Sequence, residues 1–132
     1  MKKSFKHNAF ILVTMVMILS VLAIPALAVS RTFFVKNVDS YKCQGSGSLS
    51  GTTASAAFTA TALPNKPILP DEQYSSEIVI FAYNSANEMI GSSSRYGTTS
   101  AQASYTAPGT ISWSGYTFHF SGHHLGRYVI KR

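Results

Sequence analysis

The sequence predicts a small all-β protein, an antiparallel β-sandwich of six to eight short strands that follows a cleaved signal peptide. Three observations lead to this prediction. Beyond position 28 the chain is rich in Ser, Thr, Ala, Gly, Tyr and Phe and poor in Leu, Glu and Lys, a composition that favours strand over helix. Apolar and polar residues alternate with a period of two, and turn-forming residues separate the alternating runs at short intervals. A small closed β-barrel has the same strand content and is the alternative.

The N-terminus has the features of a secretory signal peptide. Three lysines within the first six residues precede an apolar run at positions 9–24, and the small residues Ala26 and Ala28 follow it. This order predicts that residues 1–28 are a cleaved signal peptide and that residues 29–132 form a single β-sandwich domain. We therefore expect a secreted protein, extracellular or associated with the cell wall, that touches the membrane only through the signal peptide before cleavage. An uncleaved anchor is the alternative, because the apolar run nearly reaches across a thin bilayer.

The charge of the chain argues against one class of partner. Without the signal peptide, eight Lys and Arg stand against five Asp and Glu, a net charge of about +3. The basic residues are scattered, with no run longer than Lys131-Arg132, so we expect no nucleic-acid partner. The mild positive charge instead suits an anionic cell envelope.

The single cysteine bounds how the fold is held together. Cys43 has no second cysteine with which to form a disulfide inside the chain, so packing alone must stabilise the domain. We expect Cys43 to be a small buried apolar residue; a free thiol that pairs between chains is the alternative.

The first strands are predicted at residues 31–38 and 53–63, where the alternation gives each strand one solvent-exposed face. Between them, the segment CQGSGSLSG contains Gly45, Gly47 and Gly51. The glycine spacing does not match a phosphate-binding loop, and no helix follows. We interpret this segment as a bulged or twisted strand at the edge of a sheet.

A proline-rich segment, PNKPILPDEQ, follows at residues 64–73. Pro64, Pro67 and Pro70 prevent regular backbone hydrogen bonding, so the segment is expected to connect the sheets at the surface. With Lys66 at its tip, the segment could also serve as the inhibitory loop of an enzyme inhibitor.

Residues 77–94 are predicted to form a β-hairpin around the turn residues 84–87, NSAN. The first strand of this hairpin has apolar residues on both faces, so we expect it to be buried on both sides, or nearly so. The next strand is predicted within TTSAQASYTA, residues 98–107, and it ends before Pro108-Gly109, a pair that suits a type II turn.

The last two strands are predicted in TISWSGYTFHF, residues 110–120, and GRYVIKR, residues 126–132. A bulge at Gly115 would place two sets of large side chains on the same inner face. We therefore expect most of these side chains in the core rather than on a binding surface. The side chains concerned are Ile111, Trp113, Tyr116, Phe118 and Phe120.

The C-terminal region also holds the few candidates for chemistry. His119, His123 and His124 are weak candidates for metal ligands, because residues four apart in a strand lie more than about 10 Å apart unless a turn brings them together. We expect no metal and no cofactor. No serine or carboxylate pair matches a catalytic motif, so we expect no enzymatic activity. The carboxylates considered are Asp39, Asp71, Glu72, Glu77 and Glu88.

The chain as a whole has a lysine-rich signal, one Cys and many Ser, Thr and Ala, and in this it resembles small secreted β-rich proteins of unknown function from Gram-positive bacteria. With SYTAPGT and SGHH near its end, it is also similar in composition to secreted bacteriocins of the lactococcin type. The first resemblance implies no particular activity, and the second implies an antagonistic role. Neither resemblance assigns a site residue.

The expected function is that of a secreted, non-enzymatic binding or interaction module. Its candidate binding residues are tyrosines whose rings could contact sugars or a protein, namely Tyr96, Tyr105, Tyr116 and Tyr128. The expected partner is cell-wall polysaccharide or another extracellular protein. Two alternatives stay open at this point: a bacteriocin-like antagonistic protein, and an inhibitor of an extracellular enzyme that acts through the proline-rich segment.

Overall fold

The computed structural model describes residues 28–67 and 74–132, which form eight strands and no helix. No helix in this part of the chain could therefore span a membrane. The predicted signal peptide, except for its last residue, and the second half of the proline-rich segment lie outside the described residues. The strands are β1 (Val29–Val38), β2 (Tyr41–Leu49), β3 (Thr53–Ala62), β4 (Ser76–Tyr83), β5 (Met89–Gly97), β6 (Ser100–Thr106), β7 (Trp113–Phe120) and β8 (His123–Lys131).

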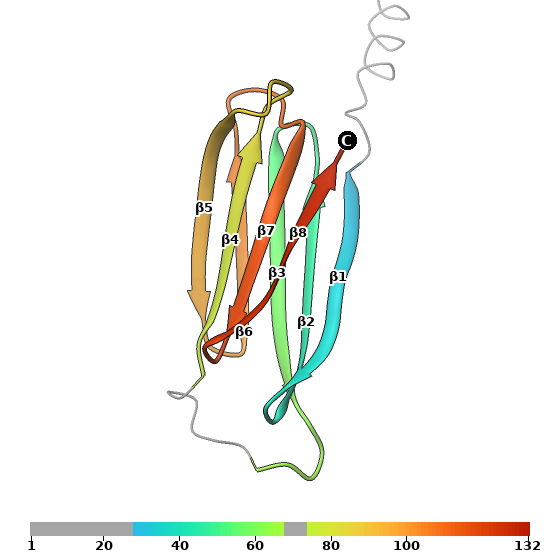
Figure 1. The fold of residues 1–132 in the computed structure, drawn as a ribbon, viewed down its shortest axis with the longest axis vertical. Helices are drawn as coiled ribbons and strands as arrows, with labels where there is room; N and C mark the ends of the chain where they lie inside the picture. Colours follow the sequence, from blue (N-terminus) through green and yellow to red (C-terminus); the bar gives the residue numbers. More distant parts are fainter. Residues whose placement is uncertain (1–27, 68–73) are drawn as a thin grey trace, which may run out of the picture.

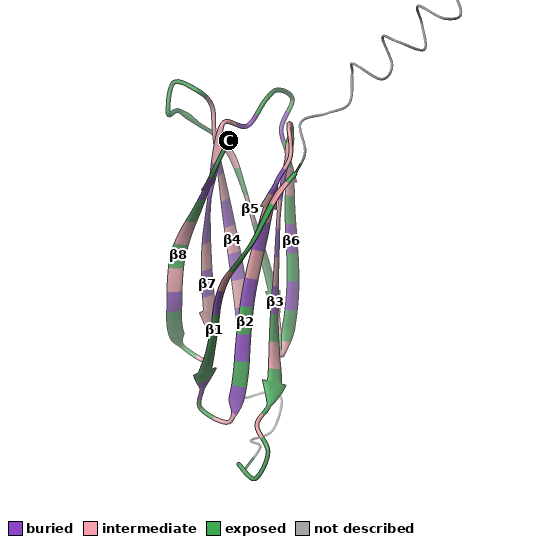
Figure 2. Ribbon diagram, turned by 90° about the vertical axis from the view of Figure 1, so that its right-hand side faces the viewer, coloured by how far each residue is buried: buried purple, intermediate pink, exposed green. Residues whose placement is uncertain are grey.

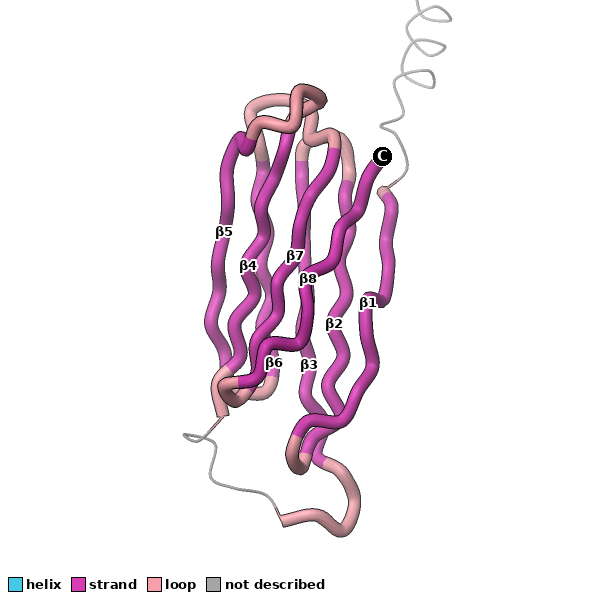
Figure 3. The backbone as a smooth tube through the Cα atoms, in the orientation of Figure 1, coloured by secondary structure: helices cyan, strands magenta, loops and turns pink. Residues whose placement is uncertain are grey.

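The strands form two four-stranded antiparallel sheets that pack face to face (Figure 1). The first sheet has the strand order β1-β2-β3-β6, and the second has the order β5-β4-β7-β8. The connecting turns lie at the two ends of the sandwich (Figure 3). The sheets do not close on one another, so the predicted β-sandwich is confirmed and the alternative barrel is not formed.

The core lies between the sheets and is built from the alternation that the sequence shows. Figure 2 shows buried and more exposed residues alternating along the strands. The predicted hairpin is confirmed: in β4 the inner side chains are buried and the outer ones are half-buried, close to the expected burial on both sides. The largest buried side chains are Tyr116, Phe58, Phe118, Phe120, Leu49, Ile78, Ile80, Ile111 and Ile130.

The glycine-rich segment forms a regular strand inside a sheet, so its interpretation as a bulged edge strand was wrong. β2 pairs with β1 on one side and with β3 on the other, and it has no bulge of its own. The alternation of β2 places Gly45 and Gly47 on the inner face, and because glycine has no side chain, aromatic rings from β1 occupy the space beside them. The ring of Phe34 lies over Gly45 and the ring of Phe33 lies over Gly47.

A bulge in β1 brings both of these rings to the inner face. The register of β1 against β2 shifts between Thr32 and Phe34, so that Phe33 is the extra residue. The Phe33 ring then stacks on Tyr128, with ring centroids 4.9 Å apart, and lies 5.1 Å from the ring of Tyr116. These contacts fill the side of the sandwich where β1 and β8 approach each other.

β7 differs from its prediction, because no bulge occurs at Gly115. The pairing of β7 with β4 is regular from Trp113 to Phe120, so Ser114 and Tyr116 point inward while Trp113 and Gly115 point outward. The expected place of Trp113 in the core is therefore wrong. The irregularity lies in β8 instead, where Gly126 pairs with Phe118 and adopts a φ of 129°, so that Leu125 is the extra residue.

The predicted burial of Cys43 is confirmed, since the side chain is fully buried on the inner face of β2. The pKa of the Cys43 thiol is raised to about 11, mainly by burial and to a smaller extent by the nearby Asp39 carboxylate, while Lys36 acts in the opposite direction. The thiol is therefore protonated and sheltered from solvent at neutral pH.

Candidate functional site

The four tyrosines proposed for binding have very different surroundings. Tyr116 is completely buried, so the expectation of an exposed ring there is wrong. Its hydroxyl accepts a hydrogen bond from the Ser114 hydroxyl and donates one to the carbonyl oxygen of Ser48, both at 2.7 Å. Because this chain of hydrogen bonds joins β7 of one sheet to β2 of the other, Tyr116 is a structural residue.

Tyr105 and Tyr128 are half-buried, and both use their hydroxyls within the fold. The Tyr105 hydroxyl donates to the carbonyl oxygen of Ile90, and the Tyr128 hydroxyl donates to that of Leu125, each at 2.9 Å. Only Tyr96, on the edge strand β5, has a freely accessible ring, with 74% of its surface exposed. The four rings do not form a common surface.

The three histidines separate into two groups. The turn between β7 and β8 brings His119 and His124 together as a cross-strand pair, with 3.1 Å between His119 Nε2 and His124 Nδ1. His123 points elsewhere and lies 3.6 Å from the Asp39 carboxylate. In the described part of the chain, no three His, Cys, Asp or Glu side chains lie close enough to hold a metal ion.

Trp113 lies half-buried on the outer face of the second sheet and stacks on Tyr83 of β4. The two ring centroids are 3.7 Å apart and the planes differ by only 3°. The Trp113 indole donates a hydrogen bond of 2.9 Å to Asn87 in the β4–β5 turn, and Lys131 lies over its ring. Tyr83 covers one face of the indole and Lys131 also lies over the ring, so Trp113 has little free ring face for stacking against a sugar.

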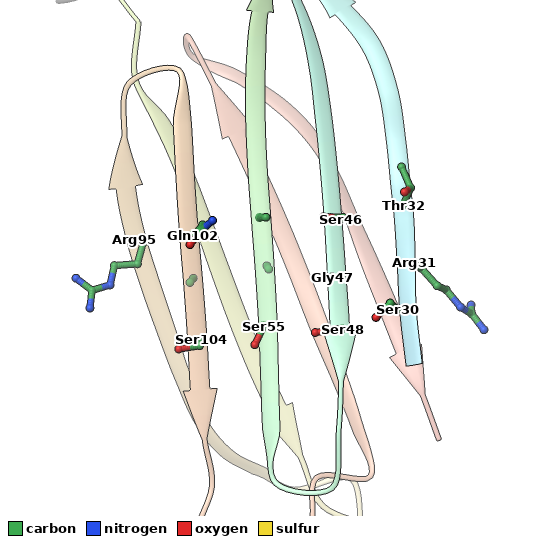
Figure 4. Close-up of a pocket in the computed structure, with 13 residues that line it drawn as sticks. Ser30, Arg31, Thr32, Ser46, Gly47, Ser48, Ser55, Arg95, Gln102 and Ser104 are labelled. Carbon is green, nitrogen blue, oxygen red and sulfur yellow. The ribbon is translucent and has the colours of Figure 1, made fainter. Parts of the chain in front are cut away.

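A hollow of about 760 Å³ lies on the outer face of the first sheet. It crosses all four strands of that sheet and reaches the edge strand β5 of the second sheet (Figure 4). Small side chains make the hollow, because Ser, Ala and Gly leave the sheet surface uncovered. Its lining residues are Ser30, Arg31, Thr32, Ser46, Gly47, Ser48, Ser55, Ala56, Ala57, Arg95, Gln102, Ala103 and Ser104.

Strand register arranges the polar side chains of this hollow in two rows that run across the strands. We call the first row the serine ladder, and it consists of four serines that are neighbours in successive pairings: Ser30, Ser48, Ser55 and Ser104. The second row is formed in the same way by Thr32, Ser46 and Gln102, with the apolar Ala57 between Ser46 and Gln102. With strands about 4.8 Å apart, the ladder is about 14 Å long.

The hydroxyls of the serine ladder have no hydrogen-bond partner within the described residues, and each can both donate and accept. No lining residue is acidic, and the two lining cations, Arg31 and Arg95, extend outward from opposite sides of the hollow (Figure 4). The hollow therefore offers hydroxyls without internal partners and accessible backbone, and one arginine extends outward beyond each end of it.

Sequence reasoning did not identify this hollow. The outward-facing serines of β2 were visible as an alternation with Tyr41, Cys43 and Leu49, but the segment was interpreted as an irregular edge strand. The hollow also needs β6 beside β3. This pairing joins residues about fifty positions apart in the sequence, and no local sequence pattern indicates it.

The proline-rich segment contributes little that bears on the inhibitor alternative. Pro64, Lys66 and Pro67 are exposed in a turn after β3, and the remainder of the segment lies outside the described residues.

No protein-family model matches the chain, and no curated protein matches it in sequence.

Proposed function

We propose that the protein is a secreted, non-enzymatic binding module of the cell envelope and that the hollow on the first sheet binds a segment of cell-wall polysaccharide. The observation that carries the proposal is the serine ladder, a line of hydroxyls without internal hydrogen bonds that crosses a whole sheet. A polysaccharide chain presents hydroxyls along its length, so it can satisfy such a row of donors and acceptors repeatedly.

The side chains of the hollow suit this ligand in two ways. Serine loses little conformational freedom when it is ordered, so the entropic cost of binding is small for each contact. Small side chains also let a polymer lie close to the sheet. Each hydrogen bond contributes only about 0.5–1.5 kcal/mol net, so affinity for one sugar unit is low and a long chain gains from several contacts at once.

The composition of the hollow favours polysaccharide over a protein partner. The centres of protein–protein interfaces are enriched in aromatic residues and Met, and their strongest contacts come from Trp, Tyr and Arg. Of these residue types only Arg31 and Arg95 line the hollow, at its margins, and no aromatic side chain and no Met lines it.

The proposal is tested by removing hydroxyls from the ladder without disturbing the strands. A Ser48→Val and Ser55→Val double variant keeps side chains that strands favour but loses two hydroxyls. A matched control, Ser92→Val and Ser94→Val, makes the same change at exposed positions on β5, outside the hollow. Both variants are compared with wild type for sedimentation with insoluble cell-wall polysaccharide, after thermal unfolding has shown that they are folded.

We expect the ladder variant to lose about tenfold or more in affinity, corresponding to two lost hydrogen bonds, while the control binds as wild type does. Equal binding by wild type and the ladder variant would show that the hollow is not the site. Absence of binding by wild type would overturn the proposed function itself.

A further inference from the structure

We infer that the polysaccharide is polyanionic, carrying carboxylate or phosphate groups, and that it lies across the strands along the serine ladder with Arg31 and Arg95 binding its charges at the two ends. This inference rests on the proposed function and names the ligand class and its orientation. The observations that carry it are the placement of the two cations, the absence of acidic lining residues and the direction of the ladder.

The two arginines come from different sheets and lie beyond opposite ends of the serine ladder, each extending away from it (Figure 4). Arg31 belongs to β1, an edge of the first sheet, and Arg95 belongs to β5, an edge of the second sheet that lies next to β6. Both side chains are exposed, and neither forms an ion pair within the described residues. Each guanidinium can therefore take a carboxylate or phosphate group through two parallel hydrogen bonds.

The charges around the hollow disfavour a cationic ligand and favour an anionic one. Three carboxylates are described, and all three lie away from the hollow: Asp39 in the β1–β2 turn, Glu77 on β4 and Glu88 in the β4–β5 turn. A neutral chain would use the serines alone, whereas an anionic chain would use the serines and both cations.

The distance between the two ends sets the length of the ligand. The ladder spans three strand spacings, about 14 Å, and the arginines lie beyond its ends. A disaccharide can reach only one arginine at a time, whereas a longer oligosaccharide can bind both at once. The affinity for a long chain should therefore exceed the affinity for a short chain by a larger factor than the ratio of their lengths. The reason is that the second arginine binds a chain that is already held by the first.

A structural role for the same residues gives the opposite expectation. Arg31 and Arg95 lie on edge strands, where charged side chains discourage pairing with the edge of another molecule. If this were their only role, replacing them would promote aggregation and leave the binding of monomeric protein unchanged.

The experiment measures binding by calorimetry for a uronic-acid disaccharide, a longer oligouronate, a poly(glycerol phosphate) chain and a neutral glucan of similar length. Wild type is compared with Arg31→Gln, Arg95→Gln and the double variant, all checked for monomeric state by gel filtration. Lys42→Gln is the matched control, because it removes one positive charge from the outer face of β2 outside the hollow.

We expect each arginine variant to lose about tenfold in affinity for a long polyanion, and about twofold for the disaccharide, with Lys42→Gln near wild type. Preference for the oligouronate identifies carboxylate groups as the ligand chemistry, preference for poly(glycerol phosphate) identifies phosphate groups, and equal binding identifies negative charge alone; each supports the inference. Equal affinity for the neutral glucan, or arginine variants that bind as wild type does, would overturn it and leave the proposed function standing. Failure of wild type to bind any of the four would overturn both.

Discussion

The ring of Phe34 lies over Gly45 of the neighbouring strand and fills the space that a side chain at position 45 would need. The same ring lies edge-on to Phe118 of the opposite sheet, with ring centroids 5.3 Å apart, and stacks loosely on Tyr128. Phe34 is therefore held from both sheets and has little freedom to move away from β2.

Gly45→Ala should destabilise the protein by about 1–3 kcal/mol, because the new methyl group overlaps the Phe34 ring. Urea unfolding measures the change. Gly109→Ala is the control, since no atom lies within 4 Å of a Cβ at that position. Combining Gly45→Ala with Phe34→Leu should cost less than the two single changes together; additive costs would show that the overlap is not the cause.

Tyr116→Phe should cost about 1–3 kcal/mol, although it removes only one oxygen atom. The Ser114 hydroxyl is fully buried and would lose its acceptor, and the Ser48 carbonyl would lose its donor. Adding Ser114→Ala to Tyr116→Phe should recover part of the loss, because the stranded donor is then gone. A double variant less stable than Tyr116→Phe in thermal unfolding would contradict this account.

The Tyr83–Trp113 stack should control the fluorescence of the only tryptophan in the chain. Tyr83→Ala exposes one face of the indole, so we expect a red-shifted emission maximum and faster quenching by acrylamide. We also expect the free energy of unfolding to fall by about 0.5–1.5 kcal/mol more than the loss of buried apolar area alone would cause. Tyr96→Ala, an exposed tyrosine on β5, is the control. Unchanged emission in Tyr83→Ala would show that the rings are not stacked in solution.

Cys43 should give the fold a distinctive sensitivity to alkaline pH. In the unfolded chain the thiol ionises near pH 9, whereas burial raises its pKa in the folded protein to about 11. Between these values the unfolded state loses a proton that the folded state keeps, so the thiol's contribution to stability is full below pH 9 and falls as pH rises toward 11. Cys43→Ala should flatten this part of the stability–pH curve relative to wild type.

The same burial predicts that a thiol-specific reagent at pH 8 labels Cys43 only after unfolding, at a rate set by opening of the structure. Rapid labelling of the folded protein, or a disulfide-linked dimer on a non-reducing gel, would contradict the buried position.

The sequence predicted the fold class well because periodicity reports which face of a strand is buried. It misplaced two elements for related reasons. Gly45 and Gly47 suggest an irregular edge by residue type, although by period they lie on the inner face together with Tyr41, Cys43 and Leu49. The bulge predicted at Gly115, which would have placed the large Trp113 side chain in the core, does not occur, and the regular alternation of β7 puts Trp113 outside. In both cases the period of two indicates the buried face more reliably than the residue type does.

The candidate site was harder to predict, because it depends on which strands are neighbours. The serines of the ladder come from β1, β2, β3 and β6, and each looks like an ordinary solvent-facing residue in its own strand. Only the pairing of β3 with β6 brings Ser55 beside Ser104. Side-chain size, which the sequence does show, explains the hollow only once that pairing is known.

The long-range pairing also determines how the chain can acquire its structure. Neighbouring strands can form hairpins early, but the β3–β6 and β4–β7 pairings join strands separated by whole intervening elements, and each is needed to complete one sheet. The chain loses conformational entropy when such large loops close, before the stabilising contacts between the strands have formed. This slows folding, to milliseconds or seconds in comparable all-β domains. The nascent polypeptide therefore cannot complete the first sheet until β6 has been synthesised, or the second sheet until β8 has been synthesised.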